Sequence, residues 1–226
     1  MNVASMSRWA RLTIGLVAAA LLPVAGAAEN ATVLPKPLKD ITASKAMTSD
    51  TAVFAGGCFW GVEAVFRHTR GVTKAVSGYA GGSAATATYE QIGTGTTGHA
   101  ESVQVTYDPT KISYGELLRI FFSVVHDPTQ LNRQGPDVGT QYRSAIFTRN
   151  DTQKEIAQAY IAQLTAAKAF PAPIVTEVTP LPAFYTAEAY HQDYLARHPT
   201  QPYIVYNDLP KLDDLKKHFP ERYVGK

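Results

Sequence analysis

Cys58 is the only cysteine in the chain and the residue best suited to act as a nucleophile. It follows Gly56 and Gly57 and precedes apolar residues at helical spacing, which predicts that it lies at a helix N-terminus. There, unpaired main-chain N–H groups and the positive end of the helix dipole favour a thiolate. A lone cysteine excludes an intramolecular disulfide and zinc sites that need two cysteines from one chain. The alternative is that Cys58 is a small buried hydrophobic residue with a structural role.

The residues around Cys58 form a specific pattern. Residues 56–63, GGCFWGVE, resemble the active-site signature of the peptide methionine sulfoxide reductase A family. Further blocks that look like this family follow in the family's order, at residues 77–82, 98–101, 105–109, 134–144 and 190–195. The resemblance therefore extends over roughly residues 50–220.

This resemblance implies catalytic roles for four side chains. Cys58 would attack the sulfur of a methionine sulfoxide, and Glu101 would protonate the departing oxygen. Burial beside aromatic groups would raise the pKa of Glu101 and keep its proton available near neutral pH. Tyr89 and Tyr142 correspond to two family tyrosines whose hydroxyls can hydrogen-bond that oxygen. Without the family pattern, both tyrosines would be interpreted as structural and Glu101 as a solvated surface residue.

The resemblance also implies a substrate pocket. Phe59 and Trp60 would hold the methyl group of the sulfoxide, while Asp137 and a bound water would orient the substrate. The enzyme-bound product would be a Cys58 sulfenic acid. Because the two sulfoxide epimers need different enzymes, the family implies the S epimer, either free or in oxidised proteins that the enzyme repairs.

The chain departs from many relatives because it has no second thiol. Gly93 stands where some relatives have a cysteine, and the tail after Leu195 contains none. An external thiol must therefore attack the sulfenic acid and give a mixed disulfide, which a second thiol resolves. A thioredoxin-like protein, a glutaredoxin-like protein or a small thiol would serve. We expect no bound cofactor, no metal and a monomer.

Two other functions remain open from the residues alone. The first is a cysteine hydrolase in which Cys58 is the nucleophile and His99 or His191 is the base. The second is a non-enzymatic module whose aromatic pocket binds a methionine in a peptide. The sequence contains neither an HExxH metal motif nor a P-loop. The 21 basic and 19 acidic residues, a formal net charge of +2, predict no nucleic-acid or anionic membrane partner.

Alternating strands and helices must position these side chains. Ten of the sixteen glycines lie between Gly56 and Gly98, which indicates turns around a site. Strands are predicted at residues 53–55, 102–107, 142–148 and 174–178, and helices at residues 58–66, 113–124, 152–169, 186–197 and 209–219. The glycine-rich connections are too irregular for a doubly wound sheet. We therefore predict an α+β fold, a two-layer α/β sandwich with a ferredoxin-like core, a mixed sheet and a loop-rich active-site face.

Residues 1–27 have the pattern of a secretory signal peptide. Arg8 and Arg11 precede an apolar run over residues 12–26, and residues 25–27 offer small side chains for cleavage. The uninterrupted apolar run has about 15 residues, whereas a membrane span needs about 20. We expect an exported protein, which is periplasmic if the cell is a Gram-negative bacterium. Residues 28–50 predict a linker or loosely packed arm, and residues 51–226 predict the catalytic domain.

Overall fold

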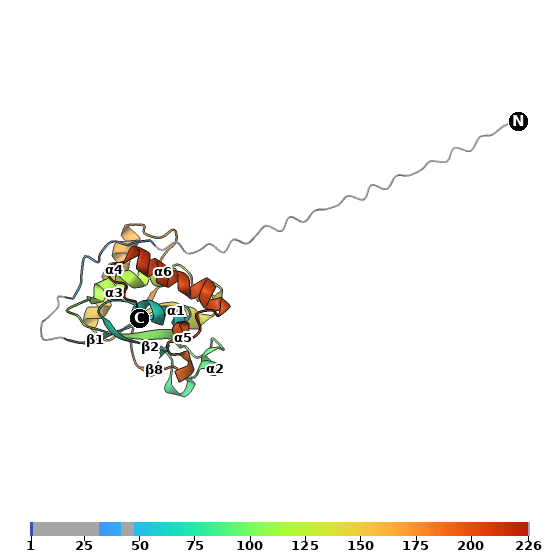
Figure 1. Ribbon diagram of the computed structural model, residues 1–226, viewed down its shortest axis with the longest axis horizontal. Helices are drawn as coiled ribbons and strands as arrows, with labels where there is room; N and C mark the ends of the chain where they lie inside the picture. The colour runs from blue at the N-terminus through green and yellow to red at the C-terminus, as the bar shows by residue number, and fades with distance from the viewer. Residues whose placement is uncertain (2–31, 42–47, 226) are drawn as a thin grey trace.

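The computed structural model describes residues 1, 32–41 and 48–225, which form an α+β fold built on a mixed sheet (Figure 1). This confirms the predicted fold class. Except for Met1, the predicted signal peptide lies outside the described residues. Among the residues that are described, no helix is long and apolar enough to cross a membrane.

The main sheet has six strands in the order β7-β6-β1-β3-β2-β8. Neighbouring strands are antiparallel except for the parallel pair of β6 and β7. The strands are β1 (Asp50–Gly56), β2 (Val72–Ala80), β3 (Ala100–Tyr107), β6 (Ser144–Thr148), β7 (Glu177–Pro180) and β8 (Phe184–Thr186). A separate short ribbon pairs β4 (Arg133–Gln134) with β5 (Asp137–Val138).

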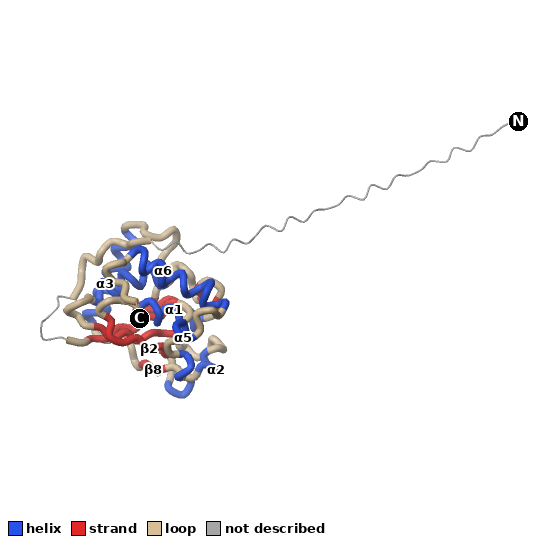
Figure 2. Tube along the Cα trace, in the orientation of Figure 1, coloured by secondary structure: helices blue, strands red, loops and turns tan. Residues whose placement is uncertain are grey.

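The helices contribute apolar side chains to one large core against the sheet. Figure 2 shows α3 and α6 on the same side of strand β2. The α-helices are α1 (Phe59–Arg67), α2 (Tyr89–Ile92), α3 (Tyr114–Ile120), α4 (Asp151–Ala166), α5 (Tyr194–Arg197) and α6 (Leu209–His218). At the centre of this core, Phe54 of β1 stacks on Phe66 of α1 and on Phe121, with ring centroids 5.1 and 5.0 Å apart. Such aromatic contacts fix the helix layer on the sheet.

The strand pairing brings three distant segments to one end of the sheet. Strand β1 is antiparallel to β3, so the end of β1 lies beside the start of β3. Strand β1 is also antiparallel to β6, and Gly56 pairs with Ser144. The segment after Gly56 therefore meets the beginning of β3 and the loop that precedes β6.

The described part of the N-terminal arm, residues 32–41, packs closely against α3 and α4 and is not loose. Leu34 is buried, and its main-chain N–H donates to Ser123 Oγ at 3.2 Å. Arg119 Nε donates to the Leu34 carbonyl at 2.7 Å, and Tyr160 donates to the Pro35 carbonyl at 2.8 Å. The composition of this segment did not predict the packing. One buried leucine and hydrogen bonds between main-chain groups of the arm and distant side chains hold it in place, and neither leaves a pattern in the composition.

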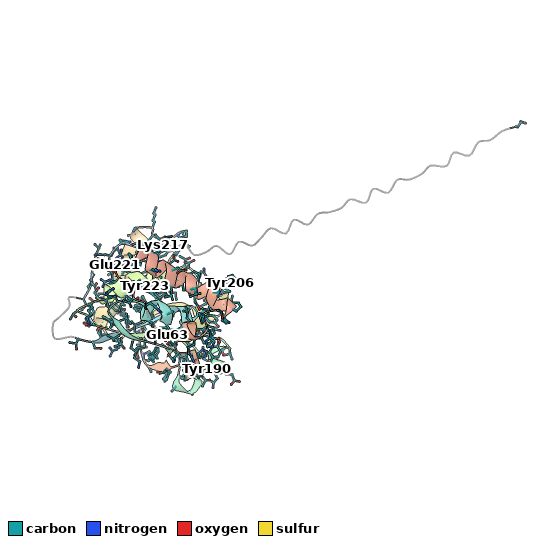
Figure 3. The ribbon with its side chains drawn as sticks, in the orientation of Figure 1. Glu63, Tyr190, Tyr206, Lys217, Glu221 and Tyr223 are labelled. Carbon is teal, nitrogen blue, oxygen red and sulfur yellow. The ribbon has the colours of Figure 1, made fainter. Side chains whose placement is uncertain are left out.

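The helix predicted over residues 186–197 is wrong for most of its length. Only α5 is α-helical there, after a short 3-10 turn over Ala189–His191. Asp193 has a left-handed backbone with φ of 57°, and its N–H donates to Glu63 Oε1 at 3.1 Å. Figure 3 shows Glu63 in the middle of the molecule. Tertiary hydrogen bonding to α1 has therefore replaced local helix formation in this segment.

Candidate active site

Cys58 is the N-cap residue of α1, and only Gly57 separates it from the end of β1. Gly57 has a φ of +89°, and a Cβ there would lie 2.6 Å from Gln134 Cβ. Only glycine fits such a backbone at this close approach. The glycine pair thus turns the chain sharply from the strand into the helix and fixes the position of the thiol, which is only 7% exposed.

A pocket of about 250 Å³ opens at Cys58. All seven side chains predicted from the sequence line it, and the structure adds two that the sequence did not indicate. The lining residues are Cys58, Phe59, Trp60, Tyr89, Glu101, Asp137, Tyr142, Gln201 and Tyr203. The two additional residues belong to the segment between α5 and α6, in which only the presence of tyrosine and glutamine beside apolar residues hints at a pocket.

The Glu101 carboxyl lies at the same helix turn as the thiol. Its Oε2 accepts a hydrogen bond from the main-chain N–H of Phe59 at 3.0 Å. The side chain is buried, and this burial raises the pKa of Glu101 to about 8 even though the Phe59 N–H lowers it. The direction of this pKa change agrees with the expectation from the sequence, and the carboxyl holds its proton at neutral pH.

Burial also raises the pKa of the Cys58 thiol well above its ordinary value. The negative charges of Glu101 and Asp208 add to this effect, whereas the main-chain amide of Trp60 and the Lys211 ammonium oppose it. The helix N-terminus favours the thiolate, as predicted, through the amide of Trp60, but it does not lower the pKa of Cys58 overall. Desolvation of the charged form outweighs the favourable helix end.

Two tyrosine hydroxyls face the same pocket from different elements. Tyr89 begins α2, where its main-chain N–H donates to Glu188 Oε1 at 2.9 Å. Tyr142 ends a 3-10 turn over Thr140–Tyr142, just before β6. Burial raises the pKa of Tyr89 to about 12 and raises the pKa of Tyr142 as well, with Glu101 adding to both effects. Both hydroxyls therefore stay protonated and can donate hydrogen bonds.

The turn that carries Tyr142 is held to the start of β3 by Arg143. Its Nη1 donates to the carbonyls of Thr140 at 2.9 Å and His99 at 3.2 Å. Its Nη2 donates to the Gly98 carbonyl at 3.0 Å, and its Nε pairs with Glu177 of β7 at 3.0 Å. One guanidinium therefore joins the loops that position Tyr142 and Glu101.

The apolar wall of the pocket is rigid. The Trp60 ring stacks on Tyr194 with centroids 3.8 Å apart, and its Nε1–H donates to His191 Nδ1 at 3.1 Å. The Phe59 ring packs against His191 at 5.0 Å. His191 also contacts Tyr89 and Tyr190, and Tyr190 lies at the same end of the molecule as α2 (Figures 1 and 3). The rings of Phe59 and Trp60 are thus held in place from behind.

Asp137 enters the pocket from strand β5 and accepts a hydrogen bond from the Tyr203 hydroxyl. Burial raises the pKa of Asp137, and the Tyr203 hydrogen bond lowers it. This pair adds a polar group to the pocket next to the apolar wall, because the Tyr203 ring meets the Trp60 ring edge-on with centroids 5.9 Å apart. Such a site can bind a ligand with one apolar and one polar end.

Neither histidine considered as a base is free to act on Cys58. His99 Nδ1 accepts from the Gly82 N–H at 3.2 Å, and its Nε2 lies 2.9 Å from the Ser83 carbonyl. His191 Nδ1 accepts from Trp60, so Nε2 carries the proton of the neutral ring and has no lone pair to act as a base; Nε2 has no hydrogen-bond partner among the described residues, and neither histidine lines the pocket. Across residues 32–41 and 48–225, no group of three or more His, Cys, Asp or Glu side chains could hold a metal ion.

Known proteins resemble this chain over nearly all of the described domain. Residues 50–223 match the family model described as peptide methionine sulfoxide reductase. A protein from Mesorhizobium japonicum named peptide methionine sulfoxide reductase MsrA 2 is 65% identical over 178 residues, 79% of this chain and 91% of that protein. An MsrA from Thermus thermophilus is 51% identical over 173 residues, 76% of this chain and 97% of that protein.

Solved structures also resemble this chain over most of its length. Reduced Mxr1 from Saccharomyces cerevisiae matches with a TM-score of 0.63 and 35% identity, over 72% of this chain and 92% of that one. Methionine sulfoxide reductase A of Corynebacterium diphtheriae matches with a TM-score of 0.59 and 38% identity, over 74% of this chain and 84% of that one.

Proposed function

Because the chain belongs to the peptide methionine sulfoxide reductase A family, we propose that the pocket at Cys58 reduces methionine sulfoxide to methionine. One observation supports this function most strongly: a buried, protonated Glu101 is hydrogen-bonded to the residue that follows Cys58. A nucleophile at the start of α1 and an acid from β3 are thus held next to each other. Neither a hydrolase nor a simple peptide-binding module requires this pair.

In the proposed first step, Cys58 sulfur attacks the sulfoxide sulfur while Glu101 delivers a proton to the sulfoxide oxygen. The attack forms an S–S bond between Cys58 and the substrate. The protonated oxygen then passes from the substrate sulfur to Cys58 as the S–O and S–S bonds break, so Cys58 becomes a sulfenic acid and methionine leaves reduced. Glu101 regains a proton as the Cys58 thiol ionises, so the carboxyl ends the step as it began. The hydroxyls of Tyr89 and Tyr142 line the pocket and can donate to the oxygen as its charge grows.

The pocket walls fit the two ends of this substrate. The Phe59 and Trp60 rings supply an apolar surface for the sulfoxide methyl group, and Asp137 supplies an acceptor for a main-chain N–H of the substrate. A fixed apolar wall beside fixed hydroxyls distinguishes the two arrangements at a chiral sulfur. The family resemblance implies that the S epimer is the one this enzyme reduces.

Regeneration of Cys58 requires thiols from other molecules, because the chain has no second cysteine. A first external thiol displaces water from the sulfenic acid and forms a mixed disulfide. A second thiol releases Cys58 and leaves with the first as a disulfide. A thioredoxin-like or glutaredoxin-like protein is the proposed donor, with a small thiol as the alternative. We further propose that the protein is exported and acts as a monomer.

A thiol-dependent assay on resolved S and R methionine sulfoxides tests this function. The wild-type protein is expected to consume the S epimer only, and Cys58→Ser is expected to abolish turnover. Glu101→Gln is expected to slow single-turnover formation of the sulfenic acid about 10²- to 10⁴-fold, the usual contribution of a positioned acid. Equal activity of Cys58→Ser and the wild type would disprove the mechanism, and equal use of both epimers would disprove the stereochemical assignment.

A further inference from the structure

A buried acid–base pair lies beside α1 and has no role in the steps above. Asp208 is fully buried, at the end of a π-helical turn over Ile204–Asp208. Lys211, on the first turn of α6, has a side chain only 14% exposed, and its Nζ lies 3.3 Å from Asp208 Oδ1. Removing two charges from water is costly, so a buried ion pair of this kind is weak evidence for a stabilising role.

Gly61 locates this pair relative to the thiol. A Cβ at Gly61 would lie 2.2 Å from Asp208 Oδ1 and 3.0 Å from Lys211 Nζ. Both charged groups therefore contact α1 at a residue that is one helix turn from its N-cap, Cys58. Any side chain at position 61 would displace them. The absence of a side chain brings the pair against the turn that carries the nucleophile.

The hydrogen bonding of Asp208 does not explain its burial. Its Oδ1 accepts from Lys211, but its Oδ2 is buried with no hydrogen-bond partner in the part of the chain that the structure describes. A structural carboxyl would normally satisfy both oxygens. Burial raises the pKa of Asp208 and the Lys211 ammonium lowers it. A negative charge on this carboxyl is poorly screened in a dry interior.

Several titratable groups face Cys58 from the elements around it. Glu101 comes from β3, Asp137 from β5, and the hydroxyls of Tyr89, Tyr142 and Tyr203 complete the pocket. Lys211 supplies a positive charge near these groups, because it lowers the pKa of Cys58, Asp137 and Asp208. Asp208 raises the pKa of both Cys58 and Glu101. The pair thus acts with opposite signs on the reacting groups.

We propose that Asp208 and Lys211 are positioning residues that set the ionisation of Cys58 from behind the helix turn. The Asp208 carboxylate adds to the effect of burial on the resting thiol, and the Lys211 ammonium opposes it. The inference rests on the proposed function of Cys58 as the nucleophile. It is tested, however, in the substrate-free protein, so its failure is distinguishable from a failure of the reductase activity.

The rate of alkylation by iodoacetamide as a function of pH provides the test, because only thiolate reacts and Cys58 is the only cysteine. Asp208→Asn is expected to lower the pKa of Cys58. At a pH below that pKa, alkylation is expected to become about tenfold faster each time the pKa falls by one. Adding Lys211→Met to Asp208→Asn removes the remaining cation and is expected to reverse part of this gain.

This reversal separates an electrostatic role from a structural one. If the pair merely held the helix in place, the double variant would be looser than the single variant and would react faster. Faster alkylation in the double variant, or no change in Asp208→Asn, would overturn the proposal. If Asp208→Asn does not fold, Lys211→Met alone decides. This variant is expected to slow alkylation of Cys58 at alkaline pH, and a faster rate would overturn the proposal.

A matched pair provides the control. Asp108 and Lys111 have the same i,i+3 spacing, with Nζ to Oδ2 at 3.0 Å, but the Lys111 side chain is 66% exposed. Asp108→Asn, with and without Lys111→Met, is expected to leave the alkylation profile unchanged. If a control variant changed the alkylation profile as much as Asp208→Asn does, the loss of any nearby charge would have this effect. That result would also overturn the proposal.

Discussion

The raised pKa of Glu101 must also affect the stability of the protein, and this effect can be measured without any substrate. The carboxyl has a pKa of about 8 in the folded protein, against an ordinary value of 4.5. Below pH 4.5 both the folded and unfolded chains hold the proton, so the stability that depends on Glu101 does not vary with pH there. Between pH 4.5 and 8 the unfolded chain ionises while the folded protein does not. The free energy of unfolding therefore falls as pH rises through this window.

Glu101→Gln replaces the carboxyl by an uncharged group of the same shape and removes this pH-dependent loss in the free energy of unfolding. A pKa difference of one corresponds to about 1.4 kcal/mol, so the full difference is at most about 5 kcal/mol above pH 8. Glutamine can still accept the Phe59 N–H, so the local hydrogen bond survives. Relative to the wild type, Glu101→Gln is expected to gain several kcal/mol between pH 5 and pH 9.

Urea denaturation of both proteins at pH 5, 7 and 9 measures this gain. Glu221, at the exposed C-terminal end labelled in Figure 3, provides the control. Glu221→Gln removes a carboxyl without removing a buried group and is expected to show no comparable gain. A stability difference for Glu101→Gln that stays constant with pH, or that reverses sign, would refute a protonated Glu101 and with it the proposed acid.

Three further substitutions test how the site is held. Arg143→Met is expected to lower kcat/KM about tenfold or more, because the loops before Glu101 and β6 lose the hydrogen bonds that join them. The circular dichroism spectrum is expected to stay unchanged. Arg149→Met, which removes a more exposed guanidinium, is the control. Leu34→Ala is expected to cost about 2–5 kcal/mol in urea denaturation, and a smaller loss would show that the arm packs weakly. Trp60→Phe removes a hydrogen bond and a stacked indole and is expected to raise KM about tenfold for the sulfoxide; an unchanged KM would refute the rigid-wall argument.

Local sequence signals were sufficient for the elements next to the nucleophile. An apolar run, two glycines and a helical period predicted the turn from β1 into α1, and each signal acts within a few residues. The Ser113 cap was also predictable, because its side chain accepts from the N–H of Glu116 three residues later. The α4 helix begins at Asp151 with Asn150 as its cap, so the helix expected there from Thr152 starts slightly earlier.

Long-range contacts decide the parts that the sequence did not predict. Tyr203 and Gln201 reach the pocket only because the segment after α5 folds back over α1, and no local period records that return. The segment over residues 186–193 has helical spacing, but Gln192 Nε2 donates to the Ser77 carbonyl at 2.9 Å and holds it against β2. Family resemblance supplied the pocket residues that patterning alone would have assigned to the surface.

The ionisation of Cys58 shows why position alone does not fix reactivity. A helix N-terminus stabilises a nearby negative charge by about 0.3–2 kcal/mol. Full burial can change a pKa by up to about 3–5, equivalent to about 4–7 kcal/mol, and the neighbouring carboxylates act in the same direction. Burial therefore dominates, and the free protein holds one proton on Cys58 and another on Glu101. The reaction must start from this protonated pair. When a sulfoxide enters the pocket, its oxygen can receive the proton of Glu101, and Glu101 can then take the proton of Cys58 as the thiol ionises.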